Sequence, residues 1–326
     1  MRVWRSSVLG LGVLAVSFVV LAATQFGRGS VQHALGVLQQ VRPGWLLLAG
    51  LGFGGSLLCS AAAWAAGLRA CGGSPEYVDV ASRYAVGSLV NSATPAHAGG
   101  AVRIALLSRT LPGRDPLLRT CGVGTAIGAA HAVGLGLLMI VAAAVGRLPL
   151  WPAPILIAVV AAAVATGMRL STRVAGRVAA VLQAFRSPRH ALELSRWVAY
   201  SYVFRVAAAV AIVASLGLSN PLIVALVLLG ALALSGLLPL TPGNFGAGAG
   251  AATFALHGAG VGVADALALG VTFQAVETCV ALLLGLAGSA LLAAPGTRLR
   301  RWSFATVAVG GLALAAMVGV VSVNLV

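Results

Sequence analysis

Long stretches without a charged side chain constrain this chain more than any other feature of its sequence. The longest of them, residues 206–264, lies between Arg205 and Asp265. As one continuous helix it would be about 90 Å long at ~1.5 Å per residue, three times the ~30 Å of hydrocarbon in a bilayer. The stretch must therefore contain turns, and residues 218–221 and 241–244 carry the Pro, Gly and Asn that favour them.

Other apolar stretches have the length of single membrane crossings, about 20 residues. Apolar residues make up 60% of the chain and charged residues only 8%, too few to cover a water-soluble surface. This composition excludes a soluble enzyme, a disordered chain and a nucleic-acid-binding module. We predict an all-α polytopic membrane protein with about seven spanning helices, at residues 6–27, 43–68, 120–146, 148–168, 197–216, 263–294 and 302–326.

The basic residues, all 21 of them arginine, lie mainly between the apolar stretches. Arginines collect on the cytoplasmic side of membrane proteins, so their positions predict orientation. With Arg2 and Arg5 in the cytoplasm, and with 77–108 entering and leaving the membrane from that side, only Arg28, Arg42 and Arg147 remain outside. We therefore expect a multi-pass protein of the cell membrane, a bacterial inner membrane, with a cytoplasmic N-terminus.

A short motif occurs twice, which predicts an internal repeat. Residues 94–99 and 241–246 both read T-P-x-x-x-G, and both interrupt long apolar stretches. Proline and glycine break helices, and broken helices at matching positions of two halves indicate a transporter's midplane site. We predict two opposed re-entrant helical hairpins in an inverted repeat. The chain would be a single membrane domain, with repeat one at about 43–146, a basic interfacial segment at 169–196, repeat two at about 197–294 and a last helix at 302–326.

The segments around these breaks resemble a known family. Residues 89–109, LVNSATPAHAGGAVRIALLSR, are similar to the N-x-x-x-P-x-x-x-G-x-x-x-R segment of the flippase-like domain family, which includes the transmembrane half of bacterial lysylphosphatidylglycerol synthase/flippases. Residues 237–268 resemble its P-x-T-P-G-G-x-G-x-x-E segment. The sequence departs from the family at 248–250, where Glu is frequent, and at Gln274, where Arg is frequent. The resemblance implies a protein that moves lipid between leaflets.

The repeated breaks also supply the candidate substrate site. Helix N-termini after the breaks point partial positive charge into the space between them, and Arg103 adds a full charge that suits a phosphate. Alternatively, the side chain of Arg103 reaches the cytoplasmic surface of the membrane and has no role in substrate binding. His97 and Asn244 align across the repeat and either line a polar pocket or bond to freed backbone groups. The candidate substrate-binding residues are Thr94, Pro95, His97, Gly99, Arg103, Thr241, Pro242, Gly243, Asn244 and Gly246.

Two charged residues lie well inside predicted spans, Arg205 and Glu277, whereas Asp265 lies at the entry of 263–294. A charge in hydrocarbon is costly unless it is paired, so we expect an intramembrane ion pair between them. The pair either holds two helices together or acts as a proton- or substrate-coupled switch.

The remaining reactive residues form no site in the sequence. The four cysteines and five histidines have no metal-ligand spacing, and no nucleotide or hydrolase motif occurs, so we expect no cofactor, no metal and no enzyme activity. We expect a flippase for a phospholipid or a polyprenyl-phosphate-linked precursor, with an anionic lipid and the membrane as partners, no nucleic acid, and a homo-oligomer as one option. The alternatives are a membrane-embedded lipid-modifying enzyme or accessory subunit, and a scaffold that transports nothing.

Overall fold

The computed structural model describes residues 42–93, 98–144, 188–235 and 247–293 of the 326-residue chain. All the regular structure in these ranges is α-helical, in agreement with the predicted class. The helices are α3 (Pro43–Ala70), α4 (Tyr77–Ala93), α5 (Ala98–Ser108), α6 (Pro116–Ala144), α9 (Pro188–Ser215), α10 (Pro221–Ser235), α11 (Ala247–Gly258) and α12 (Val263–Leu292).

Among the described residues, four helices are long and apolar enough to cross a membrane. The candidate spans are Gly44–Ala70, Pro116–Leu138, Arg189–Ser215 and Val263–Leu292, and each overlaps a span predicted from the sequence. The other three predicted spans, 6–27, 148–168 and 302–326, lie outside the described residues, as does 169–187 of the predicted interfacial segment. Residues 188–196 form the first turns of α9.

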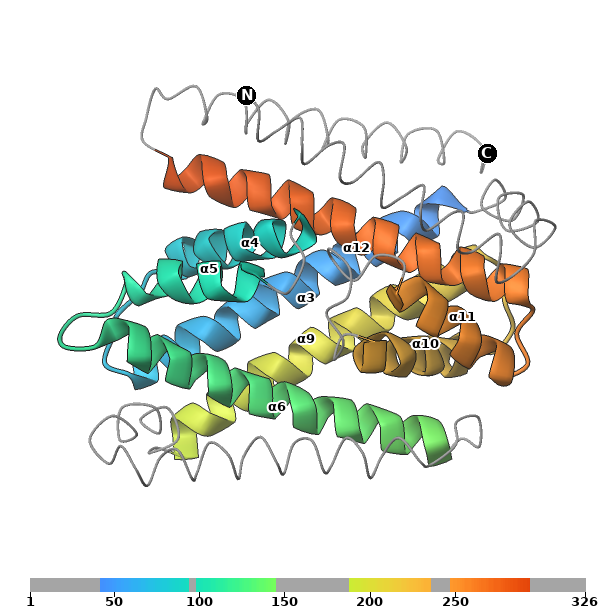
Figure 1. The fold of residues 1–326 in the computed structure, drawn as a ribbon, viewed down its shortest axis with the longest axis horizontal. Coiled ribbons are helices and arrows are strands. Elements are labelled where there is room, and N and C mark those ends of the chain that lie inside the picture. Colours follow the sequence, from blue (N-terminus) through green and yellow to red (C-terminus); the bar gives the residue numbers. More distant parts are fainter. Residues whose placement is uncertain (1–41, 94–97, 145–187, 236–246, 294–326) are drawn as a thin grey trace.

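The long helices α3 and α9 pack together along their length in antiparallel directions (Figure 1). At one end the backbone N–H of Arg42 donates to the Ser215 carbonyl oxygen, 3.3 Å away. At the other end Arg69 Nη2 lies 2.8 Å from Glu193 Oε1. Between these ends Gly52 permits the close approach, because a Cβ atom there would lie 2.9 Å from the Cβ of Ala208.

Two helical hairpins, α4–α5 and α10–α11, begin at opposite ends of the α3–α9 pair. The first follows the end of α3, and Leu68 and Cys71 there share a buried cluster with Leu111, just after α5. The second follows the end of α9, and Asn220 lines a cavity together with Gly260, just after α11. Each hairpin thus starts and finishes at one end of the molecule.

The two halves of the described chain have the same order of elements. Half one, α3–α6, and half two, α9–α12, each contain a long helix, a hairpin and a second long helix. Helix α12 packs against α4 of the other half, and α6 packs against α10. Figure 1 shows α12 and α6 at opposite edges of the described helices, with the α3–α9 pair running diagonally between them.

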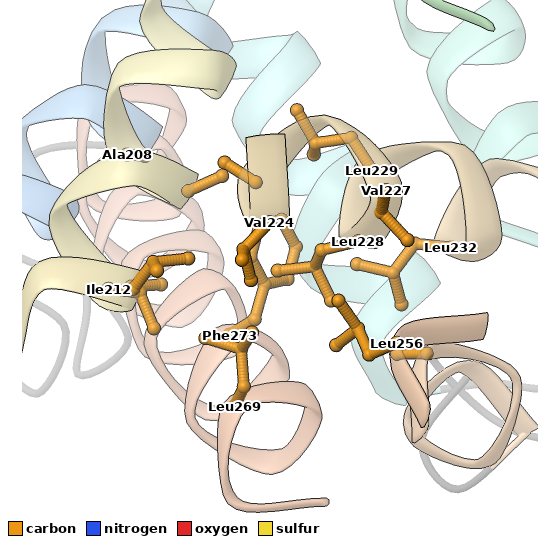
Figure 2. Packing of buried hydrophobic residues seen from close by; sticks show 14 of the residues in the cluster. Ala208, Ile212, Val224, Val227, Leu228, Leu229, Leu232, Leu256, Leu269 and Phe273 are labelled. Atoms are coloured by element: carbon orange, nitrogen blue, oxygen red, sulfur yellow. The ribbon is translucent and has the colours of Figure 1, made fainter. Parts of the chain in front are cut away.

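Buried apolar side chains form a cluster in each half. The cluster in half two joins α9, α10, α11 and α12, and Figure 2 shows Ile212, Leu228 and Phe273 converging within it. Phe53 of α3 joins this cluster through an edge-to-face contact with Phe273, with ring centroids 4.9 Å apart. The cluster in half one surrounds Trp64, Leu68 and Leu107, and Leu194 and Val198 of α9 join it.

Candidate functional site

A cavity of about 260 Å³ lies where helices from both halves meet. Helices α3, α4 and α6 of half one and α9, α10 and α12 of half two all contribute side chains to it. Leucine, phenylalanine and alanine line part of the wall. The polar side chains of the wall are those of Ser56, Ser60, Tyr84, His131, Ser201, Tyr202, Arg205 and Glu277.

The two charged side chains of the wall form an ion pair. Arg205 Nη1 of α9 lies 2.7 Å from Glu277 Oε1 of α12, so the structure brings together the two residues that the sequence analysis paired. Each side chain keeps 35% of its surface exposed, because both face the cavity. The Arg205 guanidinium also lies 5.6 Å from the centroid of the Phe273 ring. The pair is therefore accessible from the cavity and is not sealed inside packed side chains.

His131 and Tyr202 form a second polar group on the wall. The Tyr202 hydroxyl donates to the backbone carbonyl of His131 at 2.7 Å, and the two ring centroids are 5.5 Å apart. His131 Nδ1 lies 3.0 Å from the carbonyl oxygen of Ile127 in the preceding turn. These contacts hold α6 against α9 beside the ion pair.

Two of the three serines of the wall bond to their own helices. Ser60 Oγ donates to the Ser56 carbonyl at 2.9 Å, and Ser201 Oγ donates to the Val198 carbonyl at 2.7 Å. Such internal bonds let hydroxyls lie in an apolar helix without another partner. The oxygen atoms still have lone pairs that can accept a hydrogen bond from an occupant of the cavity.

Arg103, the residue that the sequence analysis proposed for phosphate, lies on α5 beside this cavity. Its guanidinium carbon is 3.9 Å from the centroid of the Tyr84 ring, and Tyr84 is part of the cavity wall. Its Nη2 donates to Ser88 Oγ at 3.1 Å, whereas its buried Nε has no hydrogen-bond partner among the described residues. Arg103 thus adds positive charge next to the cavity without lining it.

Gly99 lies at a close approach of α5 to α4. A Cβ atom at Gly99 would meet the Gly87 carbonyl oxygen and the backbone and side chain of Asn91. Only glycine fits this contact, which brings Arg103, one turn later on α5, against Tyr84 and Ser88. The structure therefore gives Gly99 a packing role next to Arg103.

The other predicted substrate-binding residues lie outside the described residues. They are Thr94, Pro95, His97, Thr241, Pro242, Gly243, Asn244 and Gly246. Their place at the substrate site stays a prediction.

Sequence reasoning missed most of the polar wall, although a signal for it exists. Helices α3 and α9 both have 28 residues and both begin with proline. Aligned from Pro43 and Pro188, the wall residues Ser56 and Ser201 coincide, and so do Ser60 and Arg205. Polar residues four apart at the same positions of two matching apolar helices mark one face of each helix.

The charges outside the cavity are distributed unevenly between the two ends of the molecule. Arginines of the described chain concentrate at the end where the first hairpin opens, and the opposite end has Arg42 and Asp265 as its charged residues. The arginines of the basic end are Arg69, Arg83, Arg109, Arg114, Arg119, Arg189 and Arg196. Two of them form ion pairs there, Arg69 with Glu193 and Arg83 with Asp79.

Comparison with known proteins identifies the family. No curated protein sequence matches the chain. The family model described as "Lysylphosphatidylglycerol synthase TM region" matches residues 7–285, which include every described helix except the last residues of α12. This match agrees with the resemblance read from the sequence. The chain therefore belongs to the lysylphosphatidylglycerol synthase transmembrane-region family, a family of membrane proteins related to lipid modification or flipping.

Proposed function

We propose that this protein moves a lipid with an anionic phosphate head group between the two leaflets of the cell membrane, and that it does not modify the lipid chemically. One observation carries the proposal: a cavity with an accessible ion pair lies where six helices of the two halves meet. Head groups need a polar path through hydrocarbon, since a charge in lipid is costly without partners.

The arrangement of the two halves supports transport. We propose that they are inverted repeats and that the hairpins α4–α5 and α10–α11 re-enter the membrane from opposite sides. In transporters of this kind the substrate lies at the interface between repeats and rocking exposes it to each side in turn. In each half the second long helix packs against the hairpin of the other half, α12 against α4 and α6 against α10. This reciprocal packing fits two repeats related by inversion.

The charge of the cavity region favours an anion. Arg205 and Arg103 provide two positive charges, and Glu277 provides one negative charge. An excess of positive charge with low-dielectric walls attracts anions from solution. The acyl or prenyl chains of the lipid would stay in the bilayer while the phosphate enters the cavity.

The basic end of the molecule suggests the orientation. The positive-inside rule would put Arg69, Arg109, Arg114 and Arg119, and so the opening of the first hairpin, in the cytoplasm. Anionic lipids of the inner leaflet would gather near these arginines, which supplies substrate to the cavity.

Translocation of a fluorescent phosphatidylglycerol in liposomes tests the proposal. We expect vesicles containing the wild-type protein to exchange the labelled lipid between leaflets faster than protein-free vesicles, as measured by quenching of the outer leaflet with dithionite. Arg103→Gln should slow this exchange at least tenfold, because it removes positive charge beside the cavity. Arg42→Gln is the matched control, because it removes the same charge from an exposed position at the end opposite the basic end. Exchange no faster than in empty vesicles would refute the proposed function.

A further inference from the structure

We infer that Glu277 competes with the lipid phosphate for the guanidinium of Arg205. In this reading the Glu277 carboxylate is an internal counter-ion of Arg205, and the phosphate head group displaces it. This inference rests on the proposed function and assigns the site at which the phosphate binds. It makes Arg205, and not Arg103, the residue that contacts the phosphate.

The first support is access. Both members of the pair line the cavity, and about a third of each side chain is exposed (35% each). An anion that enters the cavity therefore reaches Arg205 directly.

The second support is the state of the other donors on the wall. Three of the five hydroxyls on the wall, those of Ser60, Ser201 and Tyr202, each donate to a backbone carbonyl, and Ser56 and Tyr84 carry the other two. A phosphate oxygen needs donors, and guanidinium donors to phosphate are stronger than neutral ones. Arg205 is the cationic donor of the described wall, and Glu277 already occupies it at 2.7 Å.

The third support is the position of the pair within the fold. Arg205 and Glu277 both belong to half two, on α9 and α12. Motion of one half against the other does not have to separate them, because they would move together. An arriving anion, in contrast, changes their contact directly, so the pair responds to the substrate and not to the motion itself.

Binding of a short-chain lipid to the purified full-length protein in detergent tests the inference. The probe is dihexanoyl phosphatidylglycerol below its critical micelle concentration, measured by isothermal titration calorimetry. Glu277→Gln should bind it roughly tenfold more tightly than wild type, because a charge-assisted bond no longer has to be replaced. Arg205→Gln should bind it at least tenfold more weakly. Equal or weaker binding by folded Glu277→Gln would overturn the inference.

Controls separate the competition from other effects. The Arg205→Gln, Glu277→Gln double variant carries no lone charge, so it should fold, and it should bind as weakly as Arg205→Gln. Wild-type affinity in the double variant would also overturn the inference. Glu193→Gln removes an equally close carboxylate from Arg69 at the basic end, and it should change the affinity less than twofold. Inorganic phosphate should bind more weakly than the short-chain lipid, and equal affinity for both would refute a lipid site.

The binding experiment and the transport assay have separate refuting outcomes. Slow exchange by the wild-type protein in liposomes would refute the proposed function. The affinity series reads only whether Glu277 and a phosphate compete for Arg205.

Discussion

Replacing Arg205 and Glu277 by glutamine, singly and together, measures how strongly this ion pair couples α9 to α12. Glutamine keeps most of the volume of either side chain, so the substitutions change charge more than packing. Each single variant leaves one charge beside the cavity without its partner at 2.7 Å. The double variant removes both charges and leaves two amides that can bond to each other.

The structure sets the expected magnitude. Removing one member of a fully buried pair costs roughly 3–5 kcal/mol of unfolding free energy. Because 35% of each side chain is exposed to the cavity, we expect the lower part of that range. Each single variant should lose about 3 kcal/mol and the double variant less than either, because it leaves no lone charge, which gives a coupling free energy of more than about 3 kcal/mol.

Reversible unfolding in mixed detergent micelles measures these free energies. The matched control is the same cycle on Arg69 and Glu193, a pair at 2.8 Å at the end of the molecule. The exposed fractions of this pair, 42% and 31%, are similar, but at the end of the molecule water and salt screen it. Such surface pairs couple by only ~0.2–1 kcal/mol, so this cycle should give the smaller value. The result that would refute the pair as a stabilising contact is additivity. In that case the losses of unfolding free energy in the two single variants at Arg205 and Glu277 would sum to the loss in the double variant within ~0.5 kcal/mol.

Two further predictions follow from glycine packing and from the arrangement of the ends. Gly99→Ala should destabilise the protein by about 1–3 kcal/mol in thermal unfolding, because its Cβ would meet Gly87 and Asn91. Gly100→Ala should not destabilise it, since open space surrounds that position, and equal losses would contradict the close α4–α5 contact. In a cysteine-free background, Arg109→Cys and Ser187→Cys should react with a membrane-impermeant maleimide only from the cytoplasm and Ser219→Cys only from outside. Labelling of position 109 from outside would refute a first hairpin that opens to the cytoplasm.

The long helices could be predicted because the bilayer fixes their length. The apolar stretches at 43–68 and 263–294 became α3 and α12 with nearly the same bounds. The start of α9 was harder to predict, since the helix begins at Pro188 and not at Trp197. Its first turns carry Arg189, Glu193 and Arg196 and lie before the apolar stretch. They are stabilised by a contact between residues distant in sequence, the ion pair of Arg69 with Glu193.

The charged part of the site could also be predicted, because a charge in an apolar stretch needs a partner and few partners exist. The hydroxyl and imidazole groups of the cavity wall could not be predicted from the sequence. Ser60 and His131 both contact a backbone carbonyl four residues earlier, so nothing in their local sequence requires a partner elsewhere. Their common position on one cavity wall arises only when six helices meet. Arg103 was placed correctly on the helix after the first break, but the Tyr84 ring against it has no signal in the sequence.

The shortness of the hairpin helices has a consequence for biogenesis. Helices α5 and α11 have 11 and 12 residues, about 17 Å at ~1.5 Å per residue, so neither can cross ~30 Å of hydrocarbon alone. Insertion machinery that releases helices into lipid by their hydrophobicity would retain α3, α6, α9 and α12 first. The hairpins would then enter a space that these helices have already enclosed, where their broken backbone finds protein and not lipid. Assembly of the hairpins is in this sense a folding step inside the membrane that comes after insertion.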